Sequence, residues 1–192
     1  MSKDSRPVSS QYVLEYVEAV ERTQSLGFTS YPRVIVAKDC LTPERYGRMM
    51  SELLRYFDQH TPQELIGQTL SIHMALIPRL FDATGIPFQL TIGWVEFNGK
   101  AIFQHDEDTI ARFMTEKSNA WQVGDMPFHL WLTSPAFEVV DMTFAMNLGW
   151  AKNSDECARL VFYYPADKPQ ANPIYHPTLV GADFFEHIGM IL

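Results

Sequence analysis

The chain has the length and composition of one folded domain. Its 192 residues fit a single domain, and 46% of them are hydrophobic, including 13 Phe, 8 Tyr and 4 Trp, which excludes disorder over most of the length. The formal net charge of −8 argues against nucleic acid as a partner, because phosphate binding needs clustered Lys and Arg.

From the sequence we expect no leader, no membrane span and no disulfide framework. Residues 1–10 are polar and are expected to form a flexible arm rather than a signal peptide. No apolar stretch reaches the ~18–20 residues that cross a bilayer. The two cysteines, Cys40 and Cys157, have no zinc-site spacing. We therefore expect a cytoplasmic protein with no membrane contact, metal or cofactor.

The first third of the chain is predicted to be helical. Apolar residues near a 3.6 period predict a helix over 13–26. Thr42 and Thr61 are each followed by proline, which is typical of an N-cap and the first helical position. Glu64 follows Thr61 at the spacing of a capping box. Helices are therefore expected to begin after both threonines.

A further helix and a change to strand periodicity follow. The apolar segment 71–83 predicts a helix that ends at Gly85 and that Pro78 kinks or restarts. From 88 to 94, apolar and other residues alternate with period two, and Asn98-Gly99 is a strong hairpin turn. The chain therefore changes from helices to an antiparallel sheet near residue 87.

The second half of the chain is predicted to supply most of the sheet. A short helix is expected over 106–117, strands near 127–133, 137–143 and 159–164, a Pro-rich loop over 165–181, and a final helix over 182–191. Helices first and strands later predict a single α+β domain over 1–192, with N-terminal helices packed on an antiparallel sheet.

Two neighbouring strands carry a histidine and an aspartate. His129 and Asp141 are twelve residues apart across a turn at 134–136, so their side chains are expected to share one side of the sheet. Such a pair is the orienting half of a nucleophilic triad, in which the carboxylate holds one imidazole nitrogen and the other nitrogen takes a proton. The alternative is a half-buried structural histidine bonded to a backbone carbonyl.

The order of several short motifs resembles the transglutaminase-like branch of the papain-like cysteine protease fold. A helix is followed by Gly85-Ile86-Pro87, then by Ile92-Gly93-Trp94-Val95, His129-Leu130-Trp131 and Asp141-Met142-Thr143. Members of that family place a Cys at the start of the helix, and the His and Asp in the later strands. The resemblance covers about residues 65–150. It implies a papain-like core over 61–150 and chemistry at amide or acyl bonds.

The nucleophile of that family is missing from its expected place. Counting back from Gly85, the family Cys falls near Thr69-Leu70-Ser71, and Ser71 is the best match because Ala75 follows it at the family's spacing. A thiolate gains much from a helix N-terminus and an imidazolium. A serine hydroxyl gains far less and needs the histidine as a true general base. Loss of activity is the simpler interpretation.

Three further residues are candidates for the same site. Gln68 is placed to donate to an oxyanion, and Trp94 and Trp131 to line a substrate groove. Their alternatives are a solvated helix start for the glutamine and core packing for the two tryptophans.

The two cysteines and the polar patch at 105–108 are interpreted as structural. Cys40 precedes the expected nucleophile position by about thirty residues, and Cys157 follows the histidine and aspartate, so both are interpreted as packing residues. The patch from His105 to Asp108 consists of adjacent residues whose side chains diverge. Asp106 as an N-cap explains it better than a metal does.

Three interpretations remain open from the sequence. The first is an amide hydrolase or acyltransferase that uses Ser71, His129 and Asp141 on a peptide, a protein or a small amide. The second is an inactive relative whose groove binds a peptide or protein partner. The third is an ordinary α+β domain with a structural role, whose resemblance to the family is accidental. The sequence leaves the oligomeric state open.

Overall fold

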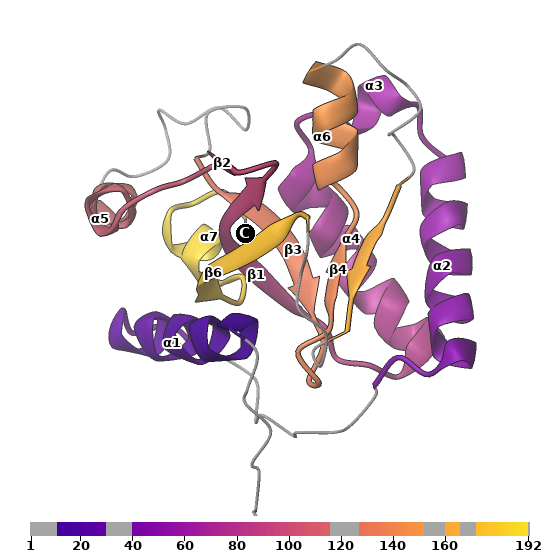
Figure 1. The fold of residues 1–192 in the computed structure, drawn as a ribbon, viewed down its shortest axis with the longest axis horizontal. Helices are drawn as coiled ribbons and strands as arrows, with labels where there is room; N and C mark the ends of the chain where they lie inside the picture. The colour runs from indigo at the N-terminus through magenta and orange to yellow at the C-terminus, as the bar shows by residue number, and fades with distance from the viewer. Residues whose placement is uncertain (1–10, 30–39, 116–126, 152–159, 166–171, 192) are drawn as a thin grey trace, which may run out of the picture.

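The protein is a mixed α+β domain built on one antiparallel sheet (Figure 1). The computed structural model describes residues 11–29, 40–115, 127–151, 160–165 and 172–191. Its helices are α1 (Gln11–Ser25), α2 (Pro43–Asp58), α3 (Pro62–Leu65), α4 (Thr69–Thr84), α5 (Glu107–Thr115), α6 (Phe144–Ala151) and α7 (Asp183–His187). Its strands are β1 (Gln89–Phe97), β2 (Lys100–Ile102), β3 (His129–Thr133), β4 (Val139–Asp141), β5 (Phe162–Tyr164) and β6 (Ile174–Val180). The α+β class and the antiparallel sheet are thus confirmed.

Strand β1 is the centre of the sheet. The strand order is β2-β1-β3-β4-β5, and β6 pairs with β1 as well. Residues 89–93 of β1 pair with β3, and residues 91–96 pair with β6. The register against β6 shifts between Ile92 and Gly93, which is the mark of a β-bulge. Such a bulge bends the strand and increases its twist locally.

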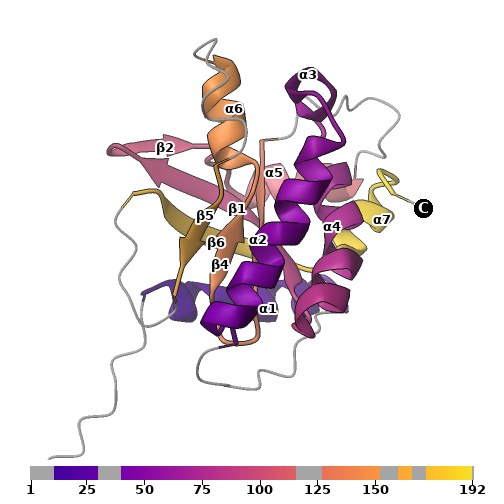
Figure 2. The ribbon, with the colours of Figure 1, turned by 90° about the vertical axis from the view of Figure 1, so that its right-hand side faces the viewer.

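The sheet separates two hydrophobic clusters. Leu130 and Leu132 of β3 belong to the larger cluster, which includes the buried faces of α2 and α4. Trp131, between them, belongs to the smaller cluster, which includes Tyr12 and Tyr16 of α1. Neighbouring residues of a strand point to opposite faces. Helix α1 therefore covers one face of the sheet and α2 with α4 the other, as Figures 1 and 2 show.

Local signals in the sequence correctly place several helix ends. The hydroxyl of Thr42 accepts a hydrogen bond from the backbone N–H of Arg45 at 3.3 Å, as an N-cap does. The N–H of Thr61 donates to the Glu64 carboxylate at 2.7 Å, which is half of the predicted capping box. Gly85 ends α4 with a left-handed φ of 70°. None of the helices in the described ranges is long and apolar enough to cross a membrane.

The fold differs from the sequence predictions at two places. Helix α4 is continuous from Thr69 to Thr84 with Pro78 inside it, so the helix does not restart there. Pro78 is exposed, so water can satisfy the carbonyl that loses its donor. The predicted Pro-rich loop 165–181 contains strand β6, with Pro177 opposite Gly93. Among the described strands β6 pairs with β1 alone, and an edge strand tolerates a residue without an N–H. The arm predicted at 1–10 lies outside the described residues.

Candidate functional site

His129 and Asp141 meet as the sequence predicts. Their strands pair with Leu132 opposite Val140, so Asp141 comes opposite Trp131 and lies diagonally from His129 on the same face. The Nε2–H of His129 donates to Oδ2 of Asp141 at 2.7 Å. The structure therefore holds an imidazole and a carboxylate in the geometry of an orienting pair.

The Asp141 carboxylate also receives donors from outside this pair. The hydroxyl of Tyr175 on β6 donates to Oδ2 at 2.8 Å. The backbone N–H groups of Thr143 and Phe144 donate to Oδ1 at 2.9 and 3.0 Å, which caps the start of α6. Burial alone would raise the pKa of Asp141, but the charge and hydrogen bond of His129, together with the Thr143 and Tyr175 donors, hold it below its usual range.

Aromatic rings enclose the pair. The His129 and Asp141 side chains are 1% and 0% exposed. Phe103 stacks on the imidazole at 5.5 Å between ring centroids, with 17° between the ring planes, and Phe144 packs edge-on at 5.3 Å. Phe103 has a φ of 61°, which is strained for a bulky side chain. A substrate reaches this imidazole only if part of the enclosure moves.

Ser71 lies away from the pair. Its side chain is exposed, and its hydroxyl donates to Oε1 of Gln68 at 3.4 Å. A different residue of α4, His73, is fully buried and interacts electrostatically with His129 and Asp141. Two residues along an α-helix correspond to a rotation of about 200°, so Ser71 and His73 point in nearly opposite directions. The three predicted triad residues do not converge.

His73 is a buried histidine that the sequence interpretation missed. Its Nδ1–H donates to the carbonyl of Thr69 at 2.7 Å, and its Nε2 has no hydrogen-bond partner. Burial lowers the pKa of His73 to about 4. The signal in the sequence was its spacing, because Leu70 and Leu76 flank it at three residues on the buried face of α4. A histidine at such a position is expected to be buried.

The pKa of His73 predicts how stability depends on pH. The unfolded chain binds a proton at this histidine near pH 6.5, and the folded chain only near pH 4. The free energy of unfolding should therefore rise between pH 4 and 6.5, by roughly 3 kcal/mol from this group, and level off above. Denaturant unfolding across this range measures the effect.

The control for this prediction is His73→Leu. Burial also lowers the pKa of His105, so the wild type has a second contribution in the same pH range. The difference between the wild-type and His73→Leu profiles isolates His73, and the variant profile should be flatter between pH 4 and 6.5. Parallel profiles would show that His73 is not buried as a neutral side chain.

The two candidate tryptophans lie in different surroundings. Trp131 is fully buried, and its Nε1–H donates to the hydroxyl of Tyr12 at 2.9 Å. Trp94 is partly buried and stacks on His176 with 3.8 Å between the ring centroids. Gln68 stands at the N-cap position of α4, where its side-chain oxygen accepts from Ser71. Trp131 thus belongs to the core, whereas Trp94 contacts His176 and Gln68 contacts Ser71, and neither contact involves the pair.

The cysteines and the acidic patch before α5 were the remaining candidates for a chemical role. Cys40 is buried in the larger cluster, where desolvation raises the pKa of its thiol. Cys157 lies outside the described residues. Asp106 accepts from the backbone N–H of Thr109 at 2.8 Å, the geometry of an N-cap on α5. In the described part of the chain, no group of three His, Cys, Asp or Glu side chains is placed to hold a metal ion.

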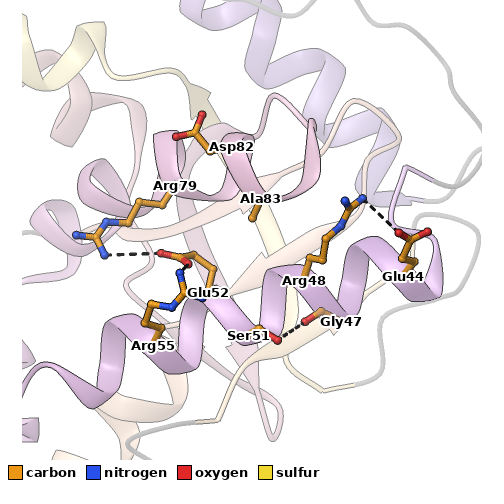
Figure 3. Close-up of a pocket in the computed structure, with 9 residues that line it drawn as sticks. All are labelled: Glu44, Gly47, Arg48, Ser51, Glu52, Arg55, Arg79, Asp82 and Ala83. Atoms are coloured by element: carbon orange, nitrogen blue, oxygen red, sulfur yellow. Dashed lines mark hydrogen bonds and ion pairs between the residues drawn. The ribbon is translucent and has the colours of Figure 1, made fainter.

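An open groove lies between α2 and α4, on the outer side of these helices (Figure 3). Its volume is about 730 Å³, and its lining comprises Glu44, Gly47, Arg48, Ser51, Glu52, Arg55, Arg79, Asp82 and Ala83. Arg55 and Arg79 both pair with the largely buried Glu52, at 2.8 and 3.7 Å. Arg48 reaches Glu44 only at 4.0 Å. The sequence interpretation did not identify this groove, because packing between two helices creates it.

Comparisons with known proteins identify no relative. No family model, no curated protein and no solved structure matches this chain.

Proposed function

We propose that the protein is a catalytically inactive, transglutaminase-like domain that binds a protein partner through the groove between α2 and α4. One observation carries the proposal. Ser71 is exposed on the opposite side of α4 from His73, while the His129–Asp141 pair is enclosed. A hydroxyl in that position has no base within reach to activate it.

The enclosed pair has a structural role in this proposal. Asp141 joins β3, β6 and the start of α6 through His129, Tyr175 and the backbone of Phe144. A buried carboxylate is stable only when donors surround it, and here each of its oxygens has at least two. Such a network fixes the relative positions of three elements without any need for turnover.

The enzyme interpretation keeps one observation in its favour. The 2.7 Å hydrogen bond between His129 and Asp141 is the contact that an orienting pair needs. Activity would require two changes at once, because Phe103 must leave the imidazole and another group must supply the nucleophile. The inactive domain requires neither change.

Labelling with a fluorophosphonate probe tests the loss of catalysis. We expect the folded protein to give no more adduct by intact mass than Ser71→Ala does, because Ser71 lacks a neighbouring base. A stoichiometric adduct that peptide mapping places on Ser71, and that His129→Ala abolishes, would overturn the proposal.

Crosslinking tests the binding role of the groove. A photoreactive amino acid at Ser51, in the groove, is compared with one at Glu18, on the exposed side of α1. We expect a discrete adduct from Ser51 that Glu18 does not give and that Gly47→Glu removes by filling the groove. Equal adducts from both positions would mean that the groove is not a binding surface.

A further inference from the structure

The groove between α2 and α4 carries equal numbers of positive and negative side chains. Three arginines and three carboxylates line it: Arg48, Arg55, Arg79, Glu44, Glu52 and Asp82. The whole chain carries a formal net charge of −8, so the rest of the protein holds all the excess negative charge. Two copies of the chain repel each other over most of their surfaces, and this groove is a neutral region where they can approach.

One stripe along α2 beside the groove consists of small or apolar residues between the charged ones. Gly47, Ser51 and Leu54 follow one another at intervals of four and three residues, so they share one side of the helix. Leu54 is 44% exposed, and Phe81 of α4 is 50% exposed. Two of the five exposed large hydrophobic residues in the described ranges thus lie on the two helices that form the groove.

Gly47 leaves space beside α2. A Cβ atom at this position would meet no atom within 4 Å, so packing inside the chain does not require glycine there. Glycine within a helix is destabilising by roughly 0.5–1 kcal/mol relative to alanine. Together with Ser51 and Ala83, it hollows the groove that Figure 3 shows.

We propose that this groove binds a second copy of the chain, with α2 of each copy lying in the groove of the other. The inference rests on the proposed binding role of the groove and names its partner. A two-fold axis near Ser51 makes the contact reciprocal, as in most homodimers. Gly47 lies four residues before Ser51, and Leu54 lies three residues after it. A two-fold axis at Ser51 therefore places Leu54 of one copy near the space beside Gly47 of the other.

The charges explain why the partner is the same chain. An acidic partner would meet Glu44 and Asp82 as well as the arginines, and a basic partner would meet the arginines. A second copy brings the same mixture of charges to this surface, in which Glu52 is largely buried and already paired with Arg55 and Arg79 within each copy. This surface favours a partner with the same charge pattern over one with a single sign of charge.

Sedimentation velocity on the intact chain tests the proposal. The wild type is studied up to about 1 mM, because small interfaces can have weak affinities. We expect a monomer–dimer equilibrium whose dissociation constant rises at least about tenfold in Gly47→Glu, since burying an unpaired charge in an interface is costly. Lys100→Glu, on the exposed strand β2, adds negative charge outside the groove and should leave the equilibrium almost unchanged.

A charge-reversal experiment separates the groove from any other interface. Arg48→Glu/Arg55→Glu gives an acidic groove, and Glu44→Lys/Asp82→Lys gives a basic one. Each double variant alone should be monomeric, and an equimolar mixture should form a one-to-one heterodimer. This outcome does not depend on which individual residues meet across the interface. Circular dichroism confirms that each variant is folded.

Three results would overturn the inference. These are a wild type that stays monomeric over the whole concentration range, a dimer that the groove variants leave unchanged, and double variants that do not associate when mixed. A dimer broken by Leu14→Glu on α1, and by none of the groove variants, would place the interface on the other exposed apolar pair, Leu14 and Val17. A monomer that still crosslinks a different protein at Ser51 would refute self-association and leave the proposed binding role intact.

Discussion

Gly93→Ala is expected to lower the free energy of unfolding by about 2–4 kcal/mol. A Cβ atom at this position would overlap the carbonyl oxygen of His176 and lie 2.6 Å from Cη2 of Trp131. The first contact is with backbone of the paired strand β6, and the second is with a fully buried ring. Neither can move without disturbing the sheet. Equilibrium unfolding in urea, followed by circular dichroism, measures the loss.

Gly47→Ala is the matched control for this prediction. The same substitution there meets no atom within 4 Å and lies in the interior of α2. It should raise the free energy of unfolding by about 0.5–1 kcal/mol, because alanine loses less backbone entropy than glycine in a helix. If the two variants had equal free energies of unfolding, β6 and Trp131 could not lie as close to Gly93 as the structure places them.

Asp141→Ala is expected to lower the free energy of unfolding by about 3–5 kcal/mol. The change leaves the donors of His129, Tyr175 and Phe144 buried without their acceptor. It also removes the cap of α6. Urea unfolding monitored by tryptophan fluorescence and by far-ultraviolet circular dichroism measures the effect on core and helices together.

Asp106→Ala provides the comparison for Asp141. Asp106 also caps a helix through a backbone N–H, but it is exposed. Its loss should be limited to about 1 kcal/mol. Asp141→Asn keeps the side-chain shape and one acceptor oxygen, so it should lie between the two alanine variants. A small loss from Asp141→Ala, similar to that of Asp106→Ala, would contradict the buried network.

The stability that Asp141 contributes decreases as the pH falls. Its pKa lies below the ordinary value in the folded protein, because His129, Thr143 and Tyr175 together outweigh the effect of burial. The unfolded chain therefore binds the proton first as the pH falls. The stability from Asp141 is present above about pH 4 and is lost as the pH drops through the folded pKa. This range lies below the one in which His73 acts.

Local sequence signals predicted the elements that depend on neighbouring residues. The N-caps at Thr42 and Asp106, the left-handed Gly85 and the facing of His129 and Asp141 all follow from spacing within a few residues or across one hairpin. Such features need no knowledge of the rest of the fold, because the chain itself brings the groups together.

Features that depend on distant parts of the chain could not be predicted in this way. Tyr175 reaches Asp141 only because β6 pairs with β1, and the prolines around it indicated a loop. The inward direction of His73, and hence the outward direction of Ser71, is set by which face of α4 packs on the sheet. The transglutaminase-like resemblance placed a nucleophile by counting residues, and counting does not fix the rotation of a helix.

The position of β6 has a consequence for how the chain folds. This strand pairs with a segment of β1 that precedes it by roughly eighty residues, and α1, near the other end of the described chain, packs against it. Helix α1 and the edge of β1 that pairs with β6 therefore cannot complete their contacts before β6 is in place. During synthesis, α2 and α4 can associate early because they are close in sequence, whereas α1 lacks the β6 part of its binding surface until residues 174–180 have emerged. We therefore expect the slow step of folding to be the joint docking of these two segments.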